Sequence, residues 1–84
     1  MDYCGLDVAG VSSYVYVANE KGRKLTCGAV DTTKAAIERR LKPFVGGGLS
    51  VAIEAGNQTA WIYDVLIGIG VKVTVVNSTK VKRR

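Results

Sequence analysis

The sequence predicts a small α/β domain built on a mixed five-stranded sheet with flanking helices. Three strand-like segments fill residues 2–29 without room for a helix between them, so they must form an antiparallel meander. Two segments with helical periodicity then alternate with two apolar runs. Strands separated by helices are parallel and joined by right-handed crossovers. We therefore expect the order β-β-β-α-β-α-β, with the first strand beside the fourth.

The meander is defined by alternation and by one turn. The first strand covers residues 2–8, and the second covers residues 11–18. Residues 19–22 (Asn-Glu-Lys-Gly) form a hairpin turn, because glycine tolerates a positive φ. In the second strand, one face carries Ser13, Val15 and Val17, and the other carries Tyr14, Tyr16 and Ala18. In the third strand, one face carries Leu25, Cys27 and Ala29.

A first helix follows the meander. Asp31 and Thr32 are expected N-cap residues, and Pro43 is expected to end or kink the helix near Lys42. Its apolar stripe consists of Ile37, Leu41, Phe44 and Val45. Residues 46–48 are three glycines that we interpret as a connector, since no Lys-Ser/Thr follows them as in a phosphate-binding loop.

The second half of the chain supplies two strands and a helix between them. An apolar strand covers residues 49–54, and a helix covers residues 58–69, closed by Gly68 and Gly70. The last strand covers residues 71–76. Residues 77–79 would cap a further helix that is cut off at Arg84.

The composition fits a globular protein of one domain. The chain has 84 residues, of which 48% are apolar, and a net charge of +5. No acidic residue follows Asp64, whereas five basic ones do: Lys72, Lys80, Lys82, Arg83 and Arg84. A basic segment of this kind indicates nucleic acid or an acidic membrane surface, and a solvated terminus is an equally good interpretation.

The cysteine and histidine content limits the possible metal sites and the cellular compartment. The chain has no histidine and no CxxC pair, which argues against a zinc site of the usual kind. Cys4 and Cys27 are expected to be buried thiols in a reducing compartment, with a disulfide as the alternative. No basic leader precedes the first strand and no apolar run has the roughly 18–20 residues of a membrane span, so we expect a cytoplasmic protein.

Two carboxylates stand out because each lies on an apolar strand. Asp7 interrupts the first strand, and Glu54 ends the strand of residues 49–54. On adjacent central strands their oxygens would converge, and hard oxygen ligands favour Mg²⁺ or Mn²⁺. The alternative is that both are strand-end side chains that reach water. Three other acids, Asp2, Asp31 and Asp64, are expected to be structural.

Two stretches of the sequence resemble known protein families. Residues 3–8 (Tyr-Cys-Gly-Leu-Asp-Val), opening a three-strand meander, resemble the start of the ribonuclease H-like fold. Residues 51–61 (Val-Ala-Ile-Glu-Ala-Gly-Asn-Gln-Thr-Ala-Trp), followed by residues 73–77 (Val-Thr-Val-Val-Asn), resemble the N-terminal RuvC-like domain of DEDD-type insertion-sequence transposases. These are relatives of the Piv/MooV DNA invertases and are described as bridge-RNA-guided recombinases. The resemblance spans nearly the whole chain and is strongest over residues 49–80.

The resemblance implies a catalytic metal site. The family uses Asp, Glu, Asp and Asp to bind Mg²⁺ or Mn²⁺ for DNA strand cleavage and transfer, and Asp7 and Glu54 match the first two. The last two acids lie beyond the basic segment in the family, so the chain resembles an N-terminal fragment that is inactive alone. Implied partners are DNA, a guide RNA and, in the full-length protein, further copies. Ala9 and Gly10 stand where the family often has serine and lysine.

Two other classes remain open at this point. Gly5-Leu6-Asp7 with Ser12 and Ser13 resembles the first phosphate loop of sugar-kinase and actin-type nucleotide-binding domains, although their Gly-Thr pair is absent. The second alternative is a non-catalytic interaction module. Stabilisation by Mn²⁺ would favour the transposase class, and stabilisation by ATP-Mg would favour the nucleotide-binding class. If neither stabilises the chain, the interaction module is favoured.

The basic segment predicts weak, salt-sensitive binding of DNA or RNA through Lys80, Lys82, Arg83 and Arg84. Charge reversal at Lys80, Lys82 and Arg83 should weaken binding more than the same change at Lys21 and Arg23. Titrations of a labelled oligonucleotide at low and moderate salt measure both effects. An affinity that does not change with salt would contradict the electrostatic basis of the prediction.

Overall fold

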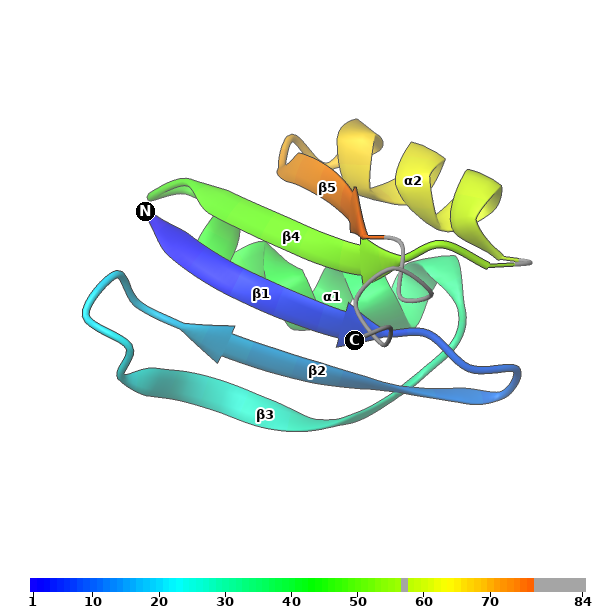
Figure 1. Ribbon diagram of the computed structural model, residues 1–84, viewed down its shortest axis with the longest axis horizontal. Coiled ribbons are helices and arrows are strands. Elements are labelled where there is room, and N and C mark those ends of the chain that lie inside the picture. The colour runs from blue at the N-terminus through cyan, green and yellow to red at the C-terminus, as the bar shows by residue number, and fades with distance from the viewer. Residues whose placement is uncertain (57, 77–84) are drawn as a thin grey trace, which may run out of the picture.

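The computed structural model describes residues 1–56 and 58–76, which form five strands and two helices. The elements are β1 (Asp2–Asp7), β2 (Ser12–Ala18), β3 (Lys24–Asp31), α1 (Lys34–Val45), β4 (Leu49–Glu54), α2 (Thr59–Gly68) and β5 (Lys72–Val76). The sheet order is β3-β2-β1-β4-β5 (Figure 1). The first three strands are antiparallel, and β4 lies parallel to both β1 and β5. The predicted mixed sheet, with the first strand beside the Glu54 strand, is confirmed.

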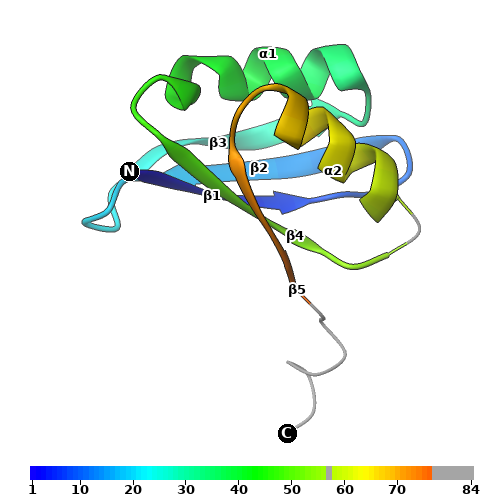
Figure 2. The same ribbon diagram turned by 90° about the horizontal axis from the view of Figure 1, so that it is seen from above.

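Both helices cover the same face of the sheet (Figure 2). The side chains buried beneath them alternate along β1, β2 and β4, as in Leu6 of β1, Val15 of β2 and Ile53 of β4. In β2 the alternation has the predicted phase, with Ser13, Val15 and Val17 buried and Tyr14 and Tyr16 exposed. We call the opposite side of the sheet the open face, because no helix in the described part of the chain covers it.

The hairpin turn between β2 and β3 forms as predicted. The carbonyl of Asn19 accepts a hydrogen bond from the amide of Gly22 at 2.9 Å, and Gly22 has φ +85°. The side-chain Oδ1 of Asn19 also accepts from the amides of Lys21 and Arg23, at 2.9 and 3.0 Å. Asparagine therefore closes the turn with its side chain as well as its backbone.

The start of α1 differs from the prediction. The N-cap is Thr33, whose Oγ1 accepts a hydrogen bond from the amide of Ala36 at 3.2 Å. Asp31 is the last residue of β3, and Thr32 uses its hydroxyl to bind the β1–β2 loop. The predicted caps were therefore wrong by one or two residues, because a tertiary contact occupies the hydroxyl that would have capped the helix.

The end of α1 also differs. The helix continues to Val45, past Pro43, instead of ending near Lys42. Proline keeps a φ that suits a helix, and in the last turn it removes only one backbone hydrogen bond. The three glycines that follow connect α1 to β4, as expected, with Gly48 at φ +94°.

The end of α2 is a Schellman motif. The amide of Val71 donates to the carbonyl of Leu66 at 3.3 Å, and the amide of Gly70 donates to the carbonyl of Ile67 at 3.1 Å. Gly70 has φ +88°, whereas Gly68 is an ordinary helical residue. Of the two glycines predicted to close the helix, only Gly70 needs to be glycine.

Two sequence-based expectations concern a C-terminal helix and a membrane span. The further helix expected after residue 77 lies outside the described residues. Among the residues that the structure does describe, no helix is long and apolar enough to cross a membrane.

The two cysteines are free and differ in environment. Cys4 lies in the core with 3% of its surface exposed, whereas Cys27 is only partly buried, on the open face. The expectation that both thiols are buried was therefore wrong for Cys27, because its strand faces solvent on that side. Burial raises the pKa of the Cys4 thiol to about 11.

We predict that Cys4 makes the protein less stable at alkaline pH. The thiol has an ordinary pKa of 9.0, raised to about 11 in the folded chain, so its stabilising contribution is complete below pH 9 and is lost as pH rises toward 11. The full loss is up to about 3 kcal/mol. Denaturant unfolding across this range should give a shallower pH slope for Cys4→Ala than for the parent.

A thiol reagent provides the control. In the native protein it should modify Cys27 quickly and Cys4 only as fast as the chain opens. Equal slopes for the parent and Cys4→Ala would show that the thiol of Cys4 does not ionise on unfolding.

Candidate functional site

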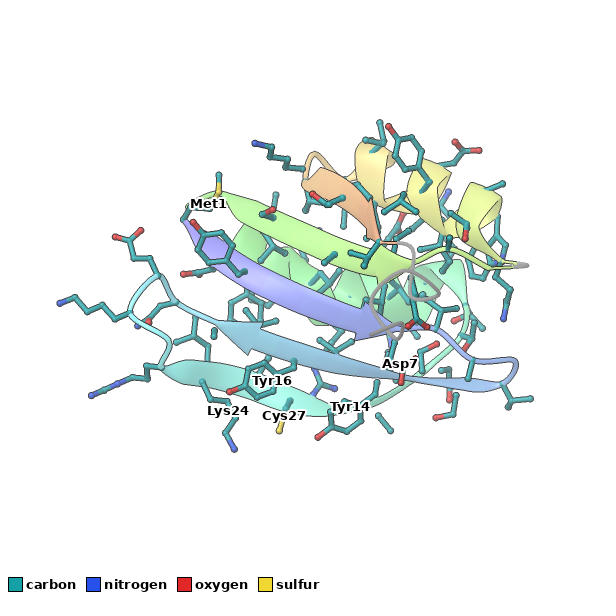
Figure 3. All side chains as sticks on the ribbon, viewed as in Figure 1. Met1, Asp7, Tyr14, Tyr16, Lys24 and Cys27 are labelled. Carbon is teal, nitrogen blue, oxygen red and sulfur yellow. The ribbon has the colours of Figure 1, made fainter. Side chains whose placement is uncertain are left out.

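The two predicted carboxylates lie side by side in the sheet. Asp7 is the last residue of β1, and Glu54 is the last residue of the parallel strand β4. The register pairs Leu6 with Ile53, so the next residue on each strand is Asp7 and Glu54 at the same level. Since Leu6 and Ile53 are buried beneath the helices, strand alternation places both acids on the open face. Figure 3 shows Asp7 at the carboxyl end of β1.

Both carboxylates are exposed and not buried. The sequence argument that buried acids require a metal ion therefore does not apply, and the alternative of strand-end side chains that reach water describes their exposure correctly. In residues 1–56 and 58–76 the ion pair is between the α-amino group of Met1 and Glu20, at 3.0 Å. Neither Asp7 nor Glu54 has a cationic partner in that part of the chain.

The loop after Asp7 is held by two hydroxyl groups. Ser13 Oγ accepts a hydrogen bond from the amide of Ala9 at 3.2 Å, and Thr32 Oγ1 donates to the carbonyl of Ala9 at 2.8 Å. The two hydroxyl oxygens are also hydrogen-bonded to each other, 2.6 Å apart. Ser13 is 3% exposed, so this network satisfies a buried polar group and fixes the chain two residues beyond Asp7.

The loop after Glu54 is held in the same way. The amide of Ala55 donates to the carbonyl of Val76 at 2.8 Å, which joins the loop to β5. Thr59 Oγ1 accepts from the amide of Gly56 at 2.6 Å and donates to the carbonyl of Gly56 at 2.9 Å. Asn57 lies outside the described residues. The backbone on the carboxyl side of each acid is therefore anchored by short hydrogen bonds.

A shallow hollow of about 450 Å³ on the open face reaches both acids. Besides Asp7 and Glu54, its lining includes the small residues Gly5 and Ala52 and the side chains of Tyr14 and Tyr16. A second hollow, of about 270 Å³, borders Glu54 from the side of the β1–β2 loop and the start of α2. We call the open-face hollow with its two acids the carboxylate hollow.

A larger cavity lies elsewhere on the described part of the chain. It has a volume of about 560 Å³ and lies between β3 and α1, beside Arg39 and Arg40. Arg40 Nη1 lies 3.5 Å from the carbonyl of Ala29, and its Nη2 lies 3.5 Å from Thr26 Oγ1. These arginines are not part of the carboxylate hollow, because no residue lines both cavities.

Tyr14 and Tyr16 are residues of the hollow that sequence reasoning did not identify as functional. Tyr14 pairs with Asp7 across β1 and β2, and Tyr16 pairs with Gly5. The neighbouring Cys27 thiol raises the pKa of the Tyr14 phenol. A signal was present in the sequence: the alternation that buries Val15 and Val17 places both tyrosines on the face of Asp7.

The donor set suits a hard divalent cation but is incomplete. Within residues 1–56 and 58–76, no three side chains of the His, Cys, Asp or Glu type come close enough to form a metal cluster. Carboxylate oxygens are the donors that Mg²⁺ and Mn²⁺ prefer, and Mg²⁺ keeps several waters when few protein ligands are present. Asp7 and Glu54 could thus provide part of such a site.

Of the predicted nucleic-acid-binding residues, Lys80, Lys82, Arg83 and Arg84 lie outside the described residues. The basic residue before them, Lys72, begins β5 and pairs with Ser50 at the opposite end of the sheet from Glu54. It therefore lies away from the carboxylate hollow.

No protein-family model matches this chain, and no curated protein matches it significantly. Its function therefore has to follow from the chemistry of the site.

We predict that Asp7→Asn and Glu54→Gln each stabilise the metal-free chain. The two acids are at the same level on neighbouring strands, and an interaction between two exposed charges is typically worth roughly 0.2–1 kcal/mol, here unfavourable because the charges are alike. An amide removes the charge with almost no change in volume. Thermal or denaturant unfolding in chelator measures the gain, and high salt should reduce it.

The double variant provides the control. If the repulsion is shared, the second amide should add less than the first, because the pair is already broken. Two independent, equal effects, or two destabilising ones, would show that the acids do not interact.

Proposed function

We propose that this chain is the N-terminal metal-binding part of a DNA transposase or recombinase, with a ribonuclease H-like fold. The observation that carries the proposal is the placement of Asp7 and Glu54 at one level on adjacent parallel strands, facing solvent on the same side. The antiparallel meander that leads into two parallel strands supports the fold assignment. The resemblance of residues 49–80 to this class of enzyme supports the chemistry.

In this proposal Asp7 and Glu54 hold Mg²⁺ or Mn²⁺ and orient it toward a DNA phosphodiester. A bound divalent ion supplies positive charge that polarises the phosphodiester and activates the attacking oxygen. The contribution of the protein is positional. Hydrogen bonds to Ser13 and Thr59 and from Thr32 hold the loops that follow the two acids, so the carboxylates are presented from fixed strand ends.

The same proposal makes the 84-residue chain inactive by itself. Enzymes of this class use four acids, and the described residues bring together only two. The remaining ligands, the DNA substrate, a guide RNA and further copies of the protein would all be needed for strand cleavage and transfer. A cytoplasmic location is part of the proposal, and the two free cysteines support a reducing compartment.

The structure gives little support to a nucleotide-binding domain of the sugar-kinase or actin type. In that class the loop after β1 would bind phosphate with its serine hydroxyls. Here the hydroxyl of Ser13 is buried and bonded to Ala9 and Thr32. An interaction module without catalysis is the outcome if no metal binds.

We predict that millimolar Mn²⁺ stabilises the parent chain and that Asp7→Asn and Glu54→Gln lose this effect. An ion at ten times its Kd stabilises the folded state by about 1.4 kcal/mol, and the amides lack the charge that holds it. Thermal melts in chelator, Mn²⁺ and ATP-Mg measure the three responses. Neither duplex nor branched DNA should be cut under these conditions.

Asp64→Asn is the matched control. Asp64 is an exposed acid on α2, in the layer opposite to the open face, so its loss should leave the Mn²⁺ response unchanged. No Mn²⁺ shift in the parent would contradict the shared site, and stabilisation by ATP-Mg alone would favour the nucleotide-binding class. Cleavage that disappears in Asp7→Asn would show that two acids suffice.

A further inference from the structure

Tyrosine side chains lie on the open face near its two acids. Tyr3, Tyr14 and Tyr16 are 50%, 48% and 44% exposed, and all three point to the open face from β1 and β2. Figure 3 looks onto this face and shows Tyr14, Tyr16 and Asp7 along the same stretch of the sheet. Half-exposed tyrosines present both a flat apolar ring and a hydroxyl group that remains hydrated.

Small residues leave a space beside these rings. Gly5 lies between Tyr16 on one side and Ala52 on the other, as the strand pairings show. In the described part of the chain, no heavy atom lies within 4 Å of a Cβ built onto Gly5. Gly5 and Ala52 therefore form the floor of the carboxylate hollow, and its volume of about 450 Å³ falls within the roughly 300–1,000 Å³ of ligand sites.

We propose that the carboxylate hollow binds an unpaired base of a single-stranded nucleic acid, stacked against Tyr16 over Gly5 and Ala52. Proteins that bind single strands on an open sheet stack bases on exposed aromatic rings in this way. The neutral, flat base suits a hollow of rings and small residues. Tyr14 pairs with Asp7, so it lies beside the acids in the row of residues next to the base.

This inference rests on the proposed function for the position of the phosphate. Tyr16 is two residues further along β2 than Tyr14, a distance of about 7 Å, so a nucleotide on Tyr16 has its backbone near Asp7 and Glu54. Two neighbouring carboxylates repel a bare phosphate, and a divalent ion between the carboxylates and the phosphate would remove that repulsion. Base stacking and metal binding are thus separate contributions to one site.

A nucleic acid fits this face better than a second copy of the chain. Each copy carries a net charge of +5, which opposes self-association and favours a polyanion. The hollow also carries the charges of Asp7 and Glu54, whereas the core of a stable dimer interface is depleted of charged residues.

A short single-stranded oligonucleotide with one 2-aminopurine tests the proposal, because its fluorescence falls when the base stacks on a ring. Titrations at moderate salt reduce the contribution of the basic segment. Tyr16→Ala should weaken binding roughly 5- to 100-fold and abolish the quenching, whereas Tyr16→Phe should retain both. Gly5→Val should also weaken binding, because it fills the hollow without displacing any described neighbour.

Tyr63→Ala is the matched control. Tyr63 is 40% exposed, like Tyr16, but lies on α2 in the other layer, so its loss should leave affinity and quenching unchanged. Melting curves establish that each variant is folded. If Tyr16→Ala does not fold, Gly5→Val still tests the proposal. Parent-like binding by folded Gly5→Val, together with parent-like quenching by Tyr16→Ala, overturns the proposal. So does a dimer that only Tyr16→Ala dissolves.

Chelator separates this inference from the proposed function. Binding that depends on Tyr16 in chelator, with no further effect of Mn²⁺, supports the base site and contradicts the metal site. A response to Mn²⁺ that Asp7→Asn removes, with no effect of Tyr16→Ala, contradicts the base site and supports the metal site.

Discussion

The structure depends on the parallel register between β1 and β4. Pairing Cys4 with Val51 and Leu6 with Ile53 places four buried side chains on the helix-covered side at matching levels. The same register sets Asp7 beside Glu54. A slip of one residue would turn the apolar side chains of one strand toward water, so burial of the core fixes the relative position of the two acids.

One-sided covering of the sheet explains the character of the open face. With α1 and α2 on the same side, alternate residues of β1, β2 and β4 are buried and the others lie on the open face. The exposed set includes two carboxylates, several tyrosines and a glycine with free space above it. On most solvent-exposed sheet faces, charged residues are spread evenly. A cluster of exposed apolar rings is instead a feature of binding surfaces.

Side-chain hydroxyl groups also hold the backbone next to the two acids. Ser13, Thr32 and Thr59 use their hydroxyls to hold the two loops that follow the acids. This use has a consequence for the neighbouring helix. Because Thr32 is bonded to Ala9, the cap of α1 passes to Thr33, and the helix begins one residue later than its sequence suggests.

The sequence by itself determined the mixed sheet, the hairpin at Asn19 and the phase of burial in β2, because these follow from local periodicity and turn chemistry. Only the tertiary structure decided the exposure of Asp7, Glu54 and Cys27, since solvent access depends on which layers cover a strand. It also decided the hollow between Gly5 and Tyr16, which lie on different strands and meet only through pairing. Local pattern specifies which way a side chain points, and long-range packing specifies what it meets there.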